Sequence, residues 1–275
     1  MRSSRLVLVV AVLVAVDGAL GSAFSQAEGV EIIEQSAAGR SEEDDKISAK
    51  IAELDDRGKL VGHEELLAQI KEPVAQKLVL AVPSEKRLTS AEIVAGARAG
   101  VVQVGWTYLC ERCNNWHLKL SGGYPISADG AVATCAHVLE VPPMKKGSLV
   151  VVDDEGNVYP VVSVLAHDEV MDAAIVKIDH ELEPFALSDQ VSPGDDAFCY
   201  SDPLGQRGYF SRGMVNRFTW GKRKRGGDDT GLRALRHLRL DVSTAWAPGS
   251  SGSPVFDGFG NVIGHVAVIS SLGKG

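Results

Sequence analysis

The feature that most constrains the fold of this chain is the sequence pattern after Gly100. Short segments rich in valine and isoleucine alternate there with turns rich in glycine, aspartate and asparagine, and no helical periodicity separates the segments. Strands that follow one another without helices between them cannot build βαβ units, so we expect an all-β fold with antiparallel sheets, either a sandwich or a barrel. The acidic turn at 153–157 indicates a hairpin. The segments predicted as strands are 101–108, 131–135, 148–152, 158–165, 173–178, 197–201, 209–219, 235–242 and 262–269.

The part of the chain before these strands has a helical character. The run Thr-Ser-Ala-Glu at 89–92 has the spacing of a capping box, which predicts a helix over 91–99. Residues 28–72 carry 13 acidic and 6 basic side chains, and their apolar residues recur at helical spacing. We expect two short amphipathic helices there, broken near Gly58 and Gly62. The acidic side chains are expected on solvated helix faces, with docking of a partner as the alternative.

The first residues have the pattern of a secretory signal peptide. Arg2 and Arg5 precede 11 uncharged, apolar residues at 6–16, and small residues follow. As a helix this apolar core would span about 17 Å, well short of a bilayer core of about 30 Å. We expect cleavage after Ala23 or Ala27 and export to the periplasm or out of the cell, with an uncleaved membrane anchor as the alternative. The expected organisation is a signal peptide over 1–27, an acidic helical segment and linker over 28–88, and a β domain over 89–275.

Composition excludes several classes of protein. The 275 residues include 45% hydrophobic and 23% charged residues, which suits a folded chain of one large domain or two small ones. A formal net charge of −8 argues against nucleic acid or an anionic membrane surface as a general partner. Four cysteines are too few to build a disulfide scaffold, so the fold must depend on its hydrophobic core.

Three segments of the β region carry side chains suited to catalysis. His137 ends a predicted strand, Asp172 directly precedes another, and Ser251 lies in a glycine-flanked turn. Each feature alone is ordinary, because histidines at strand ends and aspartates in turns are common. Together they supply the base, the orienting carboxylate and the nucleophile that acyl transfer needs, since a serine hydroxyl is a poor nucleophile near neutral pH. The N–H groups of Gly249 and Ser251 would hold the oxyanion, and this chemistry requires no metal or cofactor.

These segments resemble the signatures of trypsin-like serine peptidases with the chymotrypsin fold, most closely those of the HtrA/Deg branch. Thr-Cys-Ala-His-Val at 134–138 is similar to that branch's T-N-x-H-V, Asp-Ala-Ala-Ile-Val-Lys at 172–177 to D-L-A-L-L-K, and Gly-Ser-Ser-Gly-Ser-Pro at 249–254 to G-N-S-G-G-P. Ser-Asp-Pro-Leu-Gly at 201–205 is similar to G-N-P-F-G, and the resemblance covers roughly 90–270.

The resemblance implies two antiparallel β-barrels of chymotrypsin type with the active site between them. It implies a serine endopeptidase in which His137 is the general base, Asp172 the orienting acid and Ser251 the nucleophile. The substrates would be proteins or peptides, and the peptide is expected to add as a strand along 264–268. The resemblance leaves the oligomeric state open.

The sequence also departs from that branch. Cys135 stands where asparagine is common, and Ser253 stands where glycine is usual. The sequence ends 24 residues after Ser251, so no PDZ domain is expected. This short C-terminal part leaves an alternative open, namely a catalytically inactive binding or scaffold protein on the same fold.

The residues expected to line the primary specificity pocket are apolar. In the peptidases that this sequence resembles, the base of the pocket lies a few positions before the nucleophile, and a carboxylate there selects lysine or arginine. Here Ala245 and Trp246 occupy that stretch, while Val266 and Val268 lie on the facing strand. Because a cation buried without a partner is unfavourable, we expect cleavage after small or medium aliphatic residues, with unfolded chains preferred.

Cys110 and Cys113 form a Cys-x-x-Cys pair between two predicted strands, with His117 close behind. A thioredoxin-like redox pair would need a helix after the first cysteine, and haem attachment would need a histidine directly after the second. A structural zinc site needs four ligands, and His117 offers only a third. We expect a short disulfide at a hairpin tip, as an oxidising location favours, with two thiols or a metal site as alternatives. Cys135 and Cys199 are expected to be small core residues.

Residues 221–239 are the most basic stretch of the chain, with seven basic and two acidic side chains. We expect an exposed loop or hairpin between two strands near the serine motif. Docking of the acidic segment at 28–72, or of an anionic partner, is the alternative.

Overall fold

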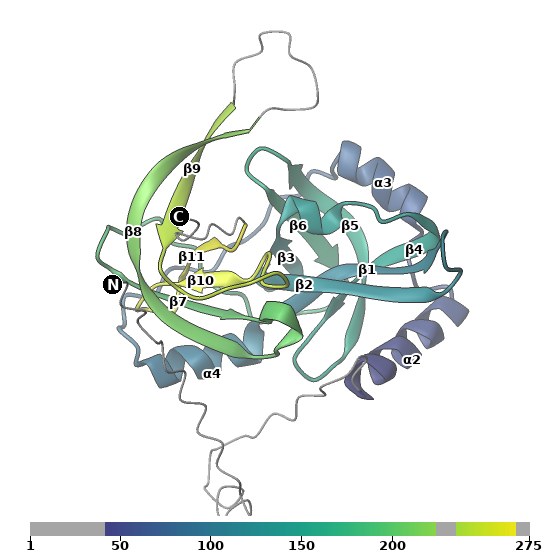
Figure 1. Cartoon of the computed structure of the whole chain (residues 1–275), viewed down its shortest axis with the longest axis horizontal. Helices are drawn as coiled ribbons and strands as arrows, with labels where there is room; N and C mark the ends of the chain where they lie inside the picture. The colour runs from purple at the N-terminus through teal and green to yellow at the C-terminus, as the bar shows by residue number, and fades with distance from the viewer. Residues whose placement is uncertain (1–41, 224–234, 268–275) are drawn as a thin grey trace, which may run out of the picture. The chain divides into compact units, whose positions relative to one another are not determined.

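The computed structural model describes residues 42–223 and 235–267, which are mainly β-structure (Figure 1). The α-helices in these ranges are α2 (Glu42–Asp56), α3 (His63–Lys71) and α4 (Ser90–Gly100). The strands are β1 (Val102–Cys110), β2 (Trp116–Ser127), β3 (Ala131–Thr134), β4 (Met144–Val152), β5 (Val158–Asp168), β6 (Ala173–Ile178), β7 (Asp196–Ser201), β8 (Tyr209–Arg223), β9 (Leu235–Val242), β10 (Pro254–Phe256) and β11 (Val262–His265). The expected signal peptide lies outside the described residues, among which no helix is long and apolar enough to span a bilayer.

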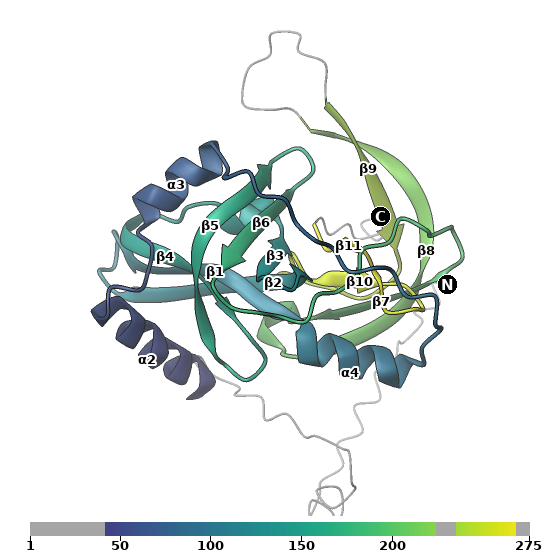
Figure 2. The ribbon, with the colours of Figure 1, turned by 180° about the vertical axis from the view of Figure 1, so that it is seen from behind.

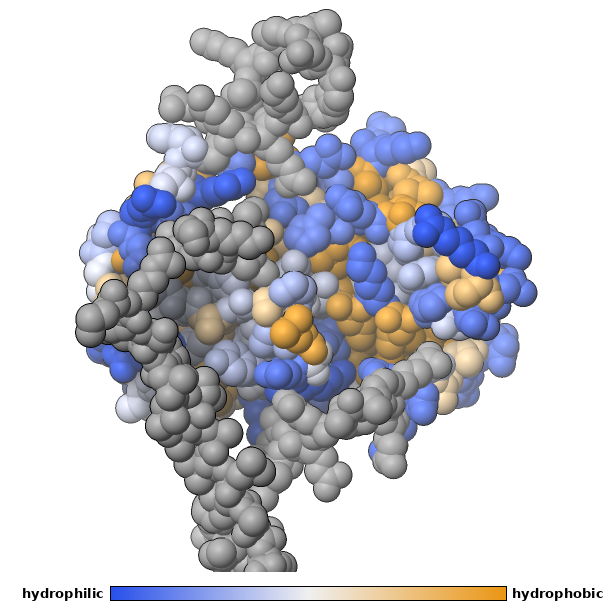
Figure 3. Space-filling model, viewed as in Figure 1, coloured by the Kyte–Doolittle hydropathy of each residue, from blue (hydrophilic) through white to orange (hydrophobic). Residues whose placement is uncertain are grey.

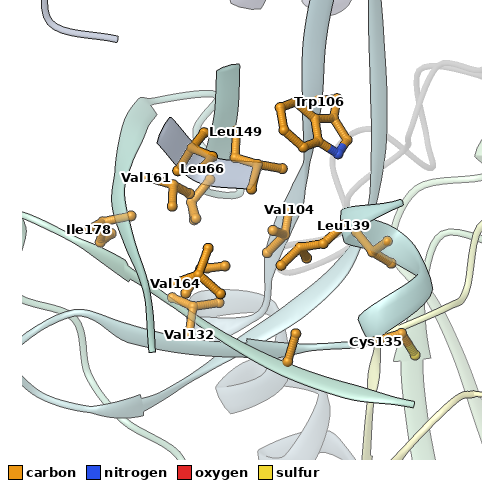
Figure 4. Packing of buried hydrophobic residues seen from close by; sticks show 14 of the residues in the cluster. Leu66, Val104, Trp106, Val132, Cys135, Leu139, Leu149, Val161, Val164 and Ile178 are labelled. Carbon is orange, nitrogen blue, oxygen red and sulfur yellow. The ribbon is translucent and has the colours of Figure 1, made fainter. Parts of the chain in front are cut away.

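Six strands close into an antiparallel barrel in the order β1-β2-β3-β6-β5-β4. Side chains alternate between the two faces of each strand, so every second residue points into the barrel. Valine and isoleucine dominate these inward positions, and Trp106 is the largest residue among them. Figure 4 shows this packing, and the fully buried residues that it labels include Val104, Trp106, Val132, Leu149, Val161 and Ile178.

The other strands form a five-stranded antiparallel sheet in the order β11-β10-β7-β8-β9, which curls into a half-barrel (Figure 1). Its own core is small and includes Ala197 and Val215. A third cluster joins the sheet to the barrel, because Tyr124 on β2 packs with Phe198 on β7 and Phe256 on β10. The prediction of an all-β fold with two antiparallel barrel-like halves is therefore confirmed, although the second half is an open sheet within the described residues.

Two strands, β2 and β10, are absent from the predicted set. Trp116, Leu118 and Leu120 of β2 alternate with polar residues, but Gly122 and Pro125 interrupt this strand pattern. Pairing with β1 along its length makes β2 a strand nevertheless. β10 has only three residues, too few to show an alternation. The hairpin expected at 153–157 is confirmed, since Val152 pairs with Val158.

The helices predicted before the strands are confirmed. The capping box of α4 is present: the Thr89 hydroxyl accepts the N–H of Glu92 at 3.2 Å, and the Glu92 carboxylate accepts the N–H of Thr89 at 2.8 Å. α2 and α3 lie along the barrel, away from the five-stranded sheet (Figures 1 and 2). Ile47 and Ile51 of α2 are buried against β4, and Leu66 of α3 belongs to the barrel core. The described part of the acidic segment therefore packs on the barrel through both of its helices.

The sequence left open that the acidic segment at 28–72 docks on the basic stretch at 221–239. The described residues of the two segments make other contacts. β8 and β9 pair as a long hairpin up to Arg223 opposite Leu235, and the rest of the basic stretch, 224–234, lies outside the described residues. On α2, Asp55 pairs with Lys146 at 3.1 Å, and Glu43 pairs with Arg207. These described ion pairs of the acidic helix go to the barrel and to the loop before β8, so nothing in them supports docking on the basic stretch.

Shortening Leu66 to alanine tests whether α3 folds together with the barrel. Because this side chain is fully buried in the barrel core, Leu66→Ala should lower the free energy of unfolding by about 2–5 kcal/mol. Leu67→Ala on the same helix is the control. Leu67 is only half-buried, so its truncation should lower the free energy of unfolding distinctly less. Urea denaturation measures both values, and equal losses in the two variants would contradict the assignment.

Candidate active site

His137 and Asp172 meet where β3 ends and β6 begins. These strands are antiparallel, with Thr134 opposite Ala174, so the residues beyond those two positions reach the same edge of the barrel. His137 lies in a 3-10 turn (Ala136–Leu139), and its Nδ1 is 2.9 Å from Oδ2 and 3.0 Å from Oδ1 of Asp172. The backbone N–H of His137 also donates to Oδ1, at 3.1 Å. The carboxylate therefore holds both the ring and the backbone of the histidine.

The hydrogen bonds of the Asp172 carboxylate fix the histidine ring in one tautomer. Asp172 is 6% exposed, and its backbone has a φ of 54°, a left-handed conformation that is uncommon outside glycine. An ionised carboxylate only accepts hydrogen bonds, so Nδ1 of His137 carries the hydrogen and Nε2 is left to accept a proton. The side chain of His137 is 30% exposed, so a substrate can reach the ring.

The turn that carries Ser251 is tied to the histidine-bearing turn by two sets of hydrogen bonds. The N–H of Gly122 on β2 donates to the carbonyl of Ser251 at 2.8 Å, and the Gly122 carbonyl accepts from the hydroxyl of Thr134 at 2.7 Å. In the second set, the carbonyl of Val266 accepts the N–H of the residue after the serine at 2.8 Å and the thiol of Cys135 at 3.1 Å. The nucleophile candidate is thus anchored on the end of β3, directly before the histidine.

Glycines give the serine turn its shape. Gly249 has a φ of 103° and Gly252 a φ of 78°, conformations that side chains rarely allow. A Cβ at Gly252 would overlap the carbonyl oxygen of Gly122 and the hydroxyl of Thr134, so no larger residue fits at this position. Within the described residues, the backbone N–H groups of Gly249 and Ser251 donate to no protein acceptor. Both groups are therefore able to bind a ligand.

The two serines of the turn have different surroundings. Ser250 is fully buried; its hydroxyl lies 3.1 Å from that of Ser201 and accepts the N–H of Ala247 at 3.3 Å. Ser251 is half-buried, and in the described part of the chain its hydroxyl makes no hydrogen bond to His137. Ser250 thus supports the turn, while Ser251 is the serine with accessible surface.

His265, at the end of β11, is a component of the site that sequence patterns do not indicate. Its Nε2 is 3.1 Å from the carbonyl oxygen of Asp172, and its Nδ1 is 3.3 Å from the hydroxyl of Tyr124. Because a carbonyl only accepts, Nε2 carries the hydrogen and Nδ1 accepts from the tyrosine. Burial lowers the pKa of His265, and the neighbouring His137 adds to the effect, while the hydrogen bond and charge of Asp172 oppose it. The neutral ring therefore supports the backbone of Asp172.

The residues predicted to line the specificity pocket are only partly brought together. Ala245 is exposed, and its N–H and carbonyl both hydrogen-bond to the hydroxyl of Ser211, at 3.1 Å and 3.0 Å. Trp246 is half-buried against the core of the five-stranded sheet. Val266 is 4% exposed and packs within that same core. Val268 lies outside the described residues.

The lowered pKa of His265 predicts a specific loss of stability in acid. Its neutral form is favoured in the fold, so the unfolded chain binds the extra proton more readily, and the contribution of His265 is present above pH about 6.5 and lost as the pH falls below that value. His265→Gln cannot titrate, so the stability advantage of the parent over this variant should shrink between pH about 7.5 and about 5. Guanidinium denaturation at both pH values measures this difference in stability. His180 is exposed, so His180→Gln is a control whose stability should change with pH as that of the parent does. A constant difference would contradict the assignment.

Known proteins share both the sequence motifs and the fold. The family of trypsin-like peptidase domains matches residues 121–264, which is 144 of the 275 residues. HhoB of Synechocystis sp., named as a candidate serine protease, is 30% identical over 156 residues, or 56% of this chain and 35% of HhoB. Do-like 14 of Arabidopsis thaliana, named as a candidate protease, is 29% identical over 154 residues, or 53% of this chain and 34% of that protein. The chain spans about a third of the length of these relatives.

Solved structures extend the comparison to the fold. The HtrA-type protease AlgW, solved with a decapeptide, matches with a TM-score of 0.53 at 20% identity, over 67% of this chain and 60% of AlgW. The Rv3671c protease of M. tuberculosis, in its active form, matches with a TM-score of 0.53 at 22% identity, over 72% of this chain and 83% of that one. At these identities the likeness shows a common fold alone. Since the family signature covers more than half of its residues, the chain belongs to the trypsin-like peptidase domain family.

Proposed function

We propose that this chain is a serine endopeptidase in which Ser251 is the nucleophile, His137 the general base and Asp172 the orienting acid. The observation that carries the proposal is the hydrogen-bonded pair of His137 and Asp172 beside a serine turn that is anchored on Gly122. Membership of the trypsin-like peptidase family supports a catalytic use of this arrangement. The accessible Nε2 of the histidine and the accessible serine are the two groups that acyl transfer requires.

The proposed reaction transfers an acyl group first to Ser251 and then to water. As the serine oxygen attacks the carbonyl carbon of the peptide bond, His137 takes the hydroxyl proton, and Asp172 stabilises the imidazolium that forms. The N–H groups of Gly249 and Ser251 bind the oxyanion of the tetrahedral intermediate. The C–N bond then breaks, and the imidazolium gives its proton to the leaving amine, which leaves an acyl-enzyme ester. A water molecule, deprotonated by the same imidazole, hydrolyses the ester and restores the serine.

The proposed substrate is an extended polypeptide. β11 pairs with β10 on one side, and beyond the bridge between Leu187 and Val262 no described strand covers its other side. A peptide can therefore add as a further strand along 264–268, of which 264–267 are described. Apolar residues also gather over the barrel on the face seen in Figure 3, with hydrophilic residues around them. Unfolded chains offer both free backbone and apolar side chains, which favours them as substrates.

We also propose that the protein is exported. The apolar segment at 6–16, preceded by two arginines and followed by small residues, supports this proposal. Sequencing the N-terminus of the protein from separated cell fractions tests it. A chain that begins at Phe24 or Glu28 in an extracytoplasmic fraction is expected, and an intact N-terminus in the cytoplasm would contradict it.

A non-catalytic binding protein on the same fold is the second candidate. The observation in its favour is that the hydroxyl of Ser251 makes no hydrogen bond to His137 among the described residues. Such bonds are often long in ligand-free enzymes and tighten in the substrate complex, so an active peptidase is compatible with the same geometry. A fluorophosphonate separates the two candidates, because it labels only an activated serine.

Replacing the nucleophile tests the triad. Ser251→Ala should abolish fluorophosphonate labelling and casein cleavage, since loss of a triad member costs on the order of 10⁴–10⁶ in turnover, while the melting temperature stays nearly unchanged. Ser250→Ala is the matched control. Ser250 is buried within the turn, so its replacement should leave Ser251 labelled by the fluorophosphonate. Undiminished hydrolysis by Ser251→Ala, or an unlabelled parent protein, would rule out the proposed chemistry.

Cleavage-site mapping tests the pocket. With no carboxylate between Thr244 and Ala247, we expect cuts in an unfolded protein to follow valine, alanine or leucine, as mass spectrometry would show. Ala245→Asp should add cuts after lysine and arginine, because the new carboxylate would pair with the cation. A parent enzyme that cuts mainly after lysine or arginine, or a variant with an unchanged pattern, would show that Ala245 does not form the base of the pocket.

A further inference from the structure

The cysteine pair outside the active site does not form the expected disulfide. Cys110 and Cys113 are both thiols in the structure, at the tip of the hairpin that joins β1 to β2. The other two cysteines, Cys135 and Cys199, are fully buried core residues, as predicted. The disulfide is absent because the thiol of Cys113 is turned toward His117, with its Sγ 2.9 Å from Nε2.

The hairpin brings three ligand atoms together. Tyr108 pairs with His117 across the hairpin, and side chains two residues apart on a strand share a face, so Cys110 and His117 point to the same side. Asn114, with a φ of 59°, reverses the chain and folds Cys113 over that side. As a result, the two Sγ atoms and the imidazole nitrogen all lie within 4.8 Å of one another.

We propose that Cys110, Cys113 and His117 bind one Zn²⁺ ion, with a fourth position left for water or an added ligand. Two thiolates and one imidazole are a donor set that favours zinc among the common divalent metals. Zinc bonds of about 2.3 Å to sulfur and about 2.0 Å to nitrogen place tetrahedral ligands roughly 3.5–3.8 Å apart, so small side-chain rotations suffice here.

The backbone of the turn favours the thiolate that a metal needs. The N–H of Arg112 donates to the sulfur of Cys110 at 3.4 Å, and a backbone N–H that points at a sulfur stabilises negative charge on it. A redox pair of the thioredoxin kind would require a helix after the first cysteine; here a five-residue turn leads directly into β2. The turn therefore suits a metal ligand pair better than a redox pair.

Zinc at this place would strengthen the contact between α2 and the barrel. His117 lines a groove of about 400 Å³ between α2 and the hairpin, together with Trp116 and Lys146. Lys146 pairs with Asp55 of α2 at 3.1 Å, and its Nζ lies 4.9 Å from the ring centre of Trp116. An ion that fixes His117 holds one wall of this groove, so zinc should raise the melting temperature.

The site is separate from the catalytic one. From His117 to Gly122, where β2 anchors the serine turn, an extended strand covers roughly 17 Å. A second group of possible ligands, formed by Cys135, His137 and Asp172, lies within the proposed triad. Any test of the hairpin site must therefore distinguish the two groups.

Cobalt provides the test, because Co²⁺ bound to thiolates absorbs strongly in the near ultraviolet and the visible range. The reduced full-length protein, handled without air, should bind about one equivalent of Co²⁺ with thiolate charge-transfer absorption, and Zn²⁺ should displace it. Cys113→Ser and His117→Gln should weaken binding more than about 100-fold, since loss of an outer-shell partner alone costs about 10–100-fold. Binding should also weaken in acid, because the ligands must lose protons.

Two controls complete the design. His180→Gln removes a histidine that is stacked on Tyr159 much as His117 is stacked on Tyr108, and it should bind cobalt like the parent. His137→Ala disrupts the second ligand group and should also keep the absorption band. No thiolate band in the reduced parent, an unchanged band in both hairpin variants, or a band lost only in His137→Ala would each overturn the proposal. Zinc should raise the melting temperature of the parent but not that of Cys113→Ser, whose circular dichroism verifies that it folds.

Discussion

The two hydrogen bonds of Gly122 connect the barrel to the serine turn, and the geometry of the site depends on them. Its N–H binds the carbonyl of Ser251, and its own carbonyl is bound by Thr134, three residues before His137. A side chain at this position would overlap Ser253, so strand and turn meet backbone to backbone. The turn of Ser251 and the turn of His137 are thus held in place by one main-chain hydrogen bond and one from the Thr134 hydroxyl, both made to the backbone of Gly122.

The fold could be predicted wherever the local pattern and the final surroundings agree. The strands expected at 173–178 and 235–242 have those bounds in the structure, and the capping box at Thr89 starts a helix as expected. β2 was not predicted because Gly122 and Pro125 interrupt the apolar–polar alternation of its first half. Its first half is held by pairing with β1, and Gly122 is needed for contact with a turn that lies well over a hundred residues later in the chain.

In the candidate active site, too, some residues can be predicted from local motifs and others cannot. His137, Asp172 and Ser251 each lie in a short motif that can be read locally, whereas His265 contacts Asp172 from 93 positions away and lies in an apolar strand that gives it no distinguishing pattern. Val266, expected beside the pocket, packs in the core of the five-stranded sheet, and its placement shows how sensitive extended segments are to register. Neighbouring residues of a strand face opposite sides, so an error of one position exchanges a surface residue for a core residue.

The pairing of β1 has a consequence for where this domain can be cut. The sequence shared with the family begins at residue 121, inside β2, yet β1 lies before that point and pairs with both β2 and β4 to close the barrel. A polypeptide cut at that boundary would expose two strand edges, which act as templates for pairing with other chains. The segment matched by the family is therefore smaller than the unit that closes the barrel. An excised form of this domain that keeps its barrel closed must include β1, although that strand holds none of the proposed catalytic residues.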